Sequence, residues 1–329
     1  MPDLPLEIDG IAVPTPASIA ALRAELRPFT RVTPVFRRDD MAPLAGTTLE
    51  FKFELLQASG TFKARGAFSN MLALDAAQRA RGVTAISAGN HAVAVAYAAM
   101  KLGISAKVVM LKTANPARLA LAKAYGAEVL MADDGASGFA MVHAIEAAEG
   151  RVFVHPFNGY RTVLGTATLG AEWAEQSAGL DALILPIGGG GLAAGVATAF
   201  RQAMPGLVIY GVEPEGATGM AQSFAAGGPV KLGALNGIAD SLMAPHTEAY
   251  SYGLCRAHID ALVTVSDAQL RDAMRVLFTE LKLATEPACA AATAAAMFPL
   301  RERIAGQRVG VLLCGTNTDP ATFMRHVTG

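Results

Sequence analysis

Short β-type runs alternate with helix-type runs along almost the whole chain, and this alternation limits the possible folds more than any other feature. Residues 48–53 alternate apolar and polar side chains, which predicts a half-buried strand. Residues 83–86 form a β-like run before a helical pattern over 91–102, and residues 107–110 precede another helical pattern. Further strand candidates lie at 182–185, 207–210, 261–264 and 309–313. Strands separated by helical crossovers predict parallel sheets with right-handed connections.

The chain length predicts more than one structural unit. The 329 residues are about twice a common domain size, which favours two compact lobes or one large α/β unit. Residues 78–151 hold several complete strand–helix units, so we expect them to form a small mobile domain. The large domain would then be discontinuous and comprise residues 1–77 and 152–329.

Charge and hydropathy exclude two classes of partner. Lysine and arginine number 27 and acidic residues 28, so a nucleic-acid binder or a polybasic membrane-surface protein is not expected. Residues 182–200 carry no charge and are nearly long enough to cross a bilayer, but they contain Pro186 and four consecutive glycines. A buried strand, a glycine loop and a buried helix explain this window better than a membrane span.

The cysteines indicate the compartment. Cys255, Cys289 and Cys314 are too few for a disulfide framework, and none belongs to a C-x-x-C pair. The N-terminus shows no basic region followed by an apolar stretch. We therefore expect a cytoplasmic protein.

Lys63 is a candidate nucleophile. It follows a strand, begins a helix, and stands between Phe62 and the small residues Ala64 and Gly66. A lone lysine is most often a solvated surface cation. A lysine desolvated in such a setting has a depressed pKa and can form a Schiff base.

Three further segments supply groups that bind anions or a ring. Residues 87–92 run from a strand end into a helix, where backbone N–H groups suit a carboxylate; a turn capped by Asn90 is the alternative. The four glycines between a strand and a helix allow backbone amides to surround a phosphate, without the pattern of a dinucleotide or nucleoside-triphosphate loop. Cys314 ends the last strand; it is either inert core or faces a ligand at the sheet edge. Together with Lys63 these parts describe a pyridoxal 5′-phosphate site.

The chain resembles the serine/threonine dehydratase and serine racemase branch of the fold-type-II, tryptophan-synthase-β-like pyridoxal-phosphate enzymes. The most specific matches are residues 60–67, residues 87–91, the tetraglycine loop and residues 285–288, in that order. The resemblance implies an α/β fold of two lobes, each with a mostly parallel sheet flanked by helices. It also implies a homodimer.

The resemblance also implies roles for individual residues. Lys63 would carry the cofactor covalently and act in catalysis, Phe62 would lie against the ring, and Asn90 would bond the phenolic oxygen. The phosphate would be held by Gly188, Gly189, Gly190 and Gly191. Cys314 would face the pyridine nitrogen as a neutral thiol. The substrate carboxylate would be held by Ser87, Ala88, Gly89, Asn90 and His91.

The implied reaction is β-elimination from a β-hydroxy amino acid such as L-threonine or L-serine, giving an α-keto acid and ammonia. A racemase is the alternative, but serine racemases have a serine where this chain has Ala88. A β-replacement synthase is disfavoured by His91, and a non-catalytic pyridoxal-phosphate binder stays open. The chain departs from the family pattern at residues 158–159, 166 and 241–242, so the substrate is expected to differ from threonine if these positions line the pocket.

The sequence leaves the presence of a divalent cation open. Family members can bind one through a glutamate, a backbone carbonyl and an aspartate. Glu213 fits the first position, but Gly219 stands where the aspartate would be. One carboxylate makes a poor Mg²⁺ or Ca²⁺ site, so no metal ligand is assigned.

Overall fold

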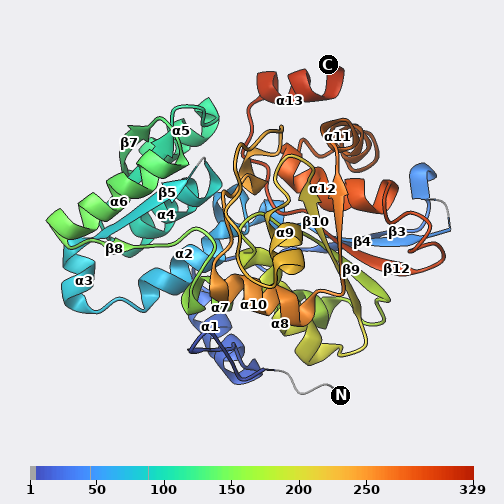
Figure 1. Ribbon diagram of the computed structural model, residues 1–329, viewed down its shortest axis with the longest axis horizontal. Helices are drawn as coiled ribbons and strands as arrows, with labels where there is room; N and C mark the ends of the chain where they lie inside the picture. The colour runs from blue at the N-terminus through green and yellow to red at the C-terminus, as the bar shows by residue number, and fades with distance from the viewer. Residues whose placement is uncertain (1–4, 45, 88) are drawn as a thin grey trace.

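The computed structural model describes residues 5–44, 46–87 and 89–329 (Figure 1). It contains a six-stranded sheet, a four-stranded sheet and a two-stranded hairpin of β1 (Glu7–Ile8) and β2 (Ile11–Ala12). In Figure 1 the four-stranded sheet and its helices lie on the left, and the six-stranded sheet occupies the centre and right.

The six-stranded sheet is the frame of the larger part of the molecule. In spatial order its strands are β11 (Ala261–Val265), β10 (Val208–Pro214), β9 (Ala182–Pro186), β12 (Arg308–Leu312), β4 (Thr48–Lys52) and β3 (Val35–Arg38). Every neighbouring pair is parallel except β3 with β4, which forms an antiparallel edge. The glycine-rich and cysteine-containing segments therefore leave adjacent strands at the same edge of the sheet.

Helices cover both faces of this sheet. The elements on the lower side in Figure 1 are α1 (Pro16–Leu26), α2 (Lys63–Leu72), α7 (Tyr160–Gln176), α8 (Gly191–Ala203), α9 (Gly219–Ala226) and α10 (Ala249–His258). The upper side holds α11 (Asp267–Leu281), α12 (Pro287–Met297) and α13 (Pro320–Thr328). Helix α12 contacts β9 to β12 directly, and its alanine-rich surface is buried on every side.

The four-stranded sheet is wholly parallel. Its spatial order is β7 (Glu128–Ala132), β6 (Ala106–Leu111), β5 (Val83–Ser87) and β8 (Val152–Phe153). Its associated helices are α3 (Ala76–Arg81), α4 (Asn90–Leu102), α5 (Pro116–Ala124) and α6 (Gly135–Glu149). Helix α6 packs against all four strands, and α4 packs against β5, β6 and α2. The contact between α2 and α4 joins the two sheets through a shared apolar core.

The predicted α/β fold with mostly parallel sheets is confirmed. The uncharged window over residues 182–200 forms β9, the glycine loop and most of α8, as expected. Over the described ranges no helix is long and apolar enough to cross a membrane. The division into domains at residues 77/78 and 151/152 stays a prediction.

The expected burial of β4 was wrong. Residues 48–53 were predicted to form a half-buried strand with a solvated polar side, but Glu50 and Lys52 are both buried. The reason is that both polar side chains meet charged partners from neighbouring elements, Arg308 on β12 and Glu172 on α7, and these partners cover the side that was expected to be solvated. Glu50 pairs with Arg308, and Lys52 pairs with Glu172 at 2.6 Å.

Lys52 belongs to a buried network of four charges that positions the start of α2. The Arg65 guanidinium donates to Glu54 at 2.6 Å and to Glu172 at 3.0 Å, while Lys52 Nζ also donates to the Thr33 carbonyl at 2.8 Å. Burial alone would raise the pKa of Glu172, but Arg65 and Lys52 hold that pKa below its usual value. Two cations and two carboxylates thus compensate one another inside the core.

Removing one carboxylate should expose how much this compensation stabilises the fold. We expect Glu172→Gln to lower the free energy of unfolding by about 3–5 kcal/mol, because a buried cation loses its partner. The matched control is Glu175→Gln, in the next turn of α7, whose exposed pair with Arg23 should contribute about 1 kcal/mol or less. Urea unfolding of both variants measures the difference; equal losses would contradict the prediction.

Candidate active site

A cavity lies between the two sheets, at the carboxyl ends of their central strands. The strand ends that reach it are those of β5, β6, β9 and β12, represented by Ser87, Leu111, Gly188 and Cys314. Crevices at the carboxyl ends of strands are where open α/β sheets bind ligands. Of the predicted site residues, those that line it are Phe62, Lys63, Ser87, Gly89, Asn90, His91, Gly188, Gly189, Gly190, Gly191 and Cys314. Ala88 lies outside the described residues.

The glycine loop presents its backbone N–H groups to this cavity. The carbonyl oxygens of Gly189, Gly190 and Gly191 accept hydrogen bonds from side chains behind the loop: the Thr247 hydroxyl at 3.0 Å, the Cys255 thiol at 3.6 Å and the Thr166 hydroxyl at 2.8 Å. Since each peptide unit is planar, the following N–H groups point the opposite way. They also belong to the first turn of α8, where N–H groups have no partner within the helix. The loop is therefore an anion-binding cradle.

Only glycine fits where this loop packs against Phe157. A Cβ on Gly189 would lie 2.2 Å from the Phe157 ring, and a Cβ on Gly191 would lie 2.2 Å from the Phe157 carbonyl oxygen. Gly190 has φ +97°, which disfavours side chains independently of space. The absence of side chains brings the loop backbone close to both Phe157 and the cavity.

Lys63 is the first residue of α2 and projects into the same cavity. Its Nζ donates a hydrogen bond to the Pro156 carbonyl and lies 5.1 Å from the centre of the Phe62 ring. Desolvation lowers the pKa of Lys63 from 10.5 to about 8. The amine is therefore partly neutral, and nucleophilic, near physiological pH.

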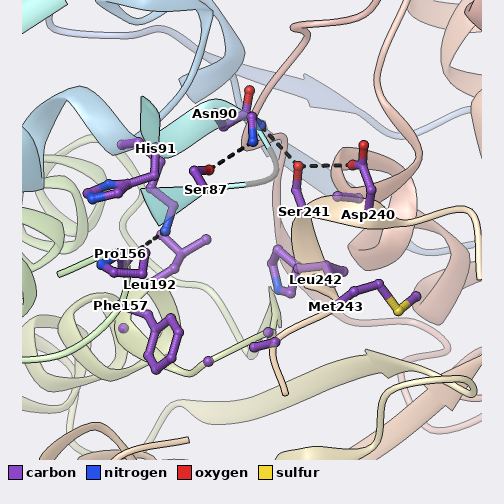
Figure 2. A pocket seen from close by; sticks show the side chains of 18 of the residues that line it. Ser87, Asn90, His91, Pro156, Phe157, Leu192, Asp240, Ser241, Leu242 and Met243 are labelled. Atoms are coloured by element: carbon purple, nitrogen blue, oxygen red, sulfur yellow. Dashed lines mark hydrogen bonds between the residues drawn. The ribbon is translucent and has the colours of Figure 1, made fainter. Parts of the chain in front are cut away.

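The loop between β5 and α4 contributes Asn90 through its side chain. The N-cap of α4 is Gly89, so the alternative in which Asn90 merely caps the helix is wrong. Asn90 Nδ2 donates to Glu286 at 2.6 Å and to the Ser241 hydroxyl at 3.3 Å, as Figure 2 shows for Ser241. His91 Nε2 donates to the Val154 carbonyl at 2.7 Å, and burial lowers its pKa to about 3. His91 is therefore a neutral, structural ring at neutral pH.

Cys314 is buried directly after β12. Its backbone carbonyl accepts a hydrogen bond from Phe62 N at 3.1 Å, which ties this strand end to the start of α2. A hydrogen bond with the Cys289 thiol and burial keep the pKa of Cys314 well above its ordinary value. The thiol is thus uncharged at neutral pH, as the prediction of a neutral group required.

The sequence reasoning assigned no role to two groups of residues at this site. One is polar and consists of Arg118, Asp240 and Glu286. The other is an apolar wall over the outer part of the cavity, formed by Ile86, Leu111, Phe139, Phe157, Met243, Ala244 and Pro245. Glu286 lies within the segment 285–288 that resembles the family, but the sequence does not predict its hydrogen bonds with Asn90 and Arg118. Arg118 and Phe139 lie on helices of the smaller sheet, and no local pattern distinguishes them from surface residues.

These features fit pyridoxal phosphate. The N–H cradle suits its phosphate, the lysine of lowered pKa suits its aldehyde, and the neutral thiol suits a ring nitrogen that is not strongly protonated. The family model described as "Pyridoxal-phosphate dependent enzyme" matches residues 26–315. The chain belongs to this family, and its cofactor is pyridoxal phosphate. The predicted family and cofactor are thereby confirmed.

Individual relatives narrow the class of reaction. The chain is 65% identical to "Phenylserine dehydratase" of Ralstonia pickettii, over 98% of both chains. It is 36% identical to "beta-hydroxyaspartate dehydratase" of Paracoccus denitrificans, over 93% of this chain and 97% of the relative. The solved structure of maize serine racemase superimposes with a TM-score of 0.89 at 34% identity, covering 95% of this chain and 96% of that one. The chain thus resembles lyases and racemases that act on small hydroxy amino acids.

The Glu213 carboxylate accepts hydrogen bonds from backbone N–H groups. Its carboxylate oxygens accept from Met220 N at 2.7 Å and Ala221 N at 2.9 Å, at the start of α9. Burial raises the pKa of this carboxyl to about 7. The assignment of no metal ligand stays a prediction.

The cradle can be tested by adding a single methyl group. We expect Gly191→Ala to weaken cofactor binding about tenfold or more, because the new Cβ would collide with the Phe157 backbone and displace the N–H groups. The matched control is Gly206→Ala, just beyond α8, where a Cβ meets nothing within 4 Å. Titration of the cofactor-free proteins with pyridoxal phosphate, followed by visible absorbance, gives both dissociation constants. Equal affinities in the two variants would argue against this cradle.

Proposed function

We propose that this protein dehydrates 3-phenylserine to phenylpyruvate and ammonia. The Cα–H and Cβ–O bonds break, water leaves, and the released enamine is hydrolysed, so that the water lost in the elimination is regained. The observation that carries the proposal is the apolar wall of the cavity, which suits a phenyl group on Cβ. The 65% identity to a phenylserine dehydratase supports the same substrate.

The side chains of this protein would share the work of the reaction. The cofactor, when bound, supplies the electron sink that allows the Cα–H bond to break. The neutral Lys63 amine is the base that takes this proton at Nζ, since its lowered pKa matches the task. N–H groups of the loop from Ser87 to His91 would hold the substrate carboxylate. The glycine loop would hold the phosphate, Phe62 would lie against the ring, and Asn90 would donate to its phenolic oxygen.

The wall favours an aromatic substituent over a charged one. The rings of Phe139 and Phe157 line the cavity, and their centres lie 6.0 Å and 5.8 Å from the centre of the His246 ring, so two aromatic side chains are available to a phenyl substituent. Among the described lining residues, Lys63 and His91 are the side chains capable of positive charge, and both are engaged with backbone carbonyls. A second substrate carboxylate would thus find no free cation, which disfavours hydroxyaspartate.

Alternative activities depend on other residues of the same site. Racemisation needs a proton donor on the second face of Cα, and this chain has Ala88 at the sequence position where serine racemases have a serine. His91, which disfavours a β-replacement synthase by its place in the sequence pattern, is bonded to the Val154 carbonyl in the structure. A homodimer in the cytoplasm also stays a prediction, because it rests on the family resemblance and the cysteine content.

The proposed substrate can be tested directly. We expect the protein loaded with pyridoxal phosphate to release phenylpyruvate and ammonia in equal amounts from L-threo-phenylserine. Burying a phenyl ring stabilises a complex by about 1.5–3 kcal/mol, so kcat/KM should exceed that for L-threonine at least about tenfold. The control Lys63→Ala should bind substrate without release. Faster turnover of L-threonine or L-serine would refute the substrate assignment, and turnover of none would favour a non-catalytic binder.

The wall itself can be tested with one truncation. We expect Phe139→Ala to lower kcat/KM for phenylserine about tenfold, and for L-threonine about threefold or less, because the methyl group of threonine does not reach the wall. The control is Phe153→Ala, whose ring packs 6.2 Å from Phe139 but does not line the cavity. A parallel loss for both substrates would show that Phe139 has no part in selectivity.

A further inference from the structure

Arg118 is a buried cation that connects the two sheets. It lies in the first turn of α5, beside the four-stranded sheet, and its side chain is 2% exposed. Its guanidinium donates three hydrogen bonds: to the Asn317 carbonyl at 2.8 Å, to Asp240 at 2.6 Å and to Glu286 at 3.0 Å. All three acceptors belong to segments around the six-stranded sheet. The contacts of Arg118 are therefore made only while the two sheets are held together as in this structure.

The same acceptors lead to the amide of Asn90. Glu286 uses its second oxygen to accept from Asn90 Nδ2 at 2.6 Å. Asp240 accepts from the Ser241 hydroxyl at 3.1 Å, and Ser241 accepts in turn from Asn90 Nδ2 at 3.3 Å (Figure 2). These bonds close a ring from Arg118 through Glu286, Asn90, Ser241 and Asp240 back to Arg118.

The charge of Arg118 favours the orientation in which the Asn90 NH₂ group faces Glu286. An ionised Glu286 can only accept, so it requires the NH₂ group of Asn90; a protonated carboxyl could donate to the amide oxygen instead. Burial raises the pKa of Glu286, and Arg118 opposes that rise. The amide oxygen of Asn90 is occupied independently by Asn317 Nδ2 at 2.9 Å. With the cation in place, Asn90 offers a donor, and not an acceptor, to the cavity.

Gly89 provides the space that Arg118 occupies. A Cβ at this position would lie 2.2 Å from Arg118 Cδ and 2.8 Å from Nη1. The guanidinium therefore passes directly beneath the loop that carries Asn90. This contact is independent of the hydrogen-bonded ring and joins Arg118 to Gly89, the backbone neighbour of Asn90.

We propose that Arg118 is a positioning residue that orients the Asn90 amide toward the bound cofactor through Glu286, so that the cofactor site is completed by the smaller sheet. The inference rests on the proposed contact between Asn90 and the cofactor, and not on the identity of the substrate. Both Asn90 N–H groups are already engaged, the bond to Ser241 being the longer. The phenolic oxygen of the cofactor would replace Ser241 as the acceptor, while Glu286 keeps the other hydrogen.

Absorbance of the bound cofactor tests this role without substrate. We expect Arg118→Met to change the ratio of the visible to the near-ultraviolet band in the same direction as Asn90→Ala, because both remove a fixed donor from the phenolic oxygen. Arg118→Lys keeps the charge near Glu286 and should retain the wild-type spectrum. With the preferred amino acid, Arg118→Met should lower kcat about tenfold or more.

A control on the same helix separates positioning from stability. Asn115 also joins α5 to the other side of the molecule, through Asp319 at 2.8 Å, and does not line the cavity. Asn115→Ser, which keeps a hydroxyl to cap α5, should leave the spectrum unchanged. A lower melting temperature for Arg118→Met with a wild-type spectrum would overturn the proposal.

The route through Glu286 is tested with a double variant. This variant removes both charges of the buried pair, so it can also be used if Arg118→Met alone does not fold. Arg118→Met combined with Glu286→Gln should show a spectrum no more altered than the more affected single variant, since both act on the same amide. Independent, multiplying effects would overturn the proposed route. Because the spectra are measured without turnover, they test the role of Arg118 even if phenylserine is not the substrate.

Discussion

The charges buried beneath α2 hold the reactive end of that helix in place. Arg65 stands two residues after Lys63, and its guanidinium is bound to carboxylates from the segment after β4 and from α7. A cation in the core is tolerated only while its partners stay within hydrogen-bond distance. The first turn of α2 therefore cannot rotate or slide without exposing an uncompensated charge, and the direction in which Lys63 leaves the helix is fixed. The rest of the cavity is arranged around that direction.

The remaining parts of the site lie in segments that directly follow the carboxyl ends of parallel strands. Strands β9 and β12 of the six-stranded sheet and β5 of the four-stranded sheet all end at the cavity between the sheets, and the segment after each strand brings backbone N–H groups or a small neutral side chain. Backbone donors carry no net charge, so they can bind a phosphate and a carboxylate without placing further cations beside Lys63, whose pKa is lowered to about 8. Arg118 pairs with Glu286 and Asp240 beside the Asn90 loop, so these full charges near the cavity compensate one another.

Sequence reasoning found the parts of the site that obey local rules. Lys63 after a strand, four glycines before a helix and a cysteine at a strand end are all recognisable from neighbours in sequence. The partners of these residues are not, because Arg118 and Glu286 are 168 positions apart and meet only through packing of the two sheets. The burial of Lys52 could not be predicted for the same reason. An alternating pattern is typical of a strand with one solvated side, and only the elements packed around β4 determine that both sides are covered.

The two sheets contribute different parts of the site: one carries the groups for the cofactor, and the other carries part of the wall that meets the substrate. The large sheet and its helices carry the lysine, the glycine loop and the thiol, which would hold the cofactor. The smaller sheet carries Phe139 and part of the apolar wall, which meet the substituent on Cβ in the proposed function. Changes on α6 can alter that wall without touching the cradle. A change at Arg118 would act differently, since it reaches the cofactor side through Asn90 and would alter the reaction of every substrate.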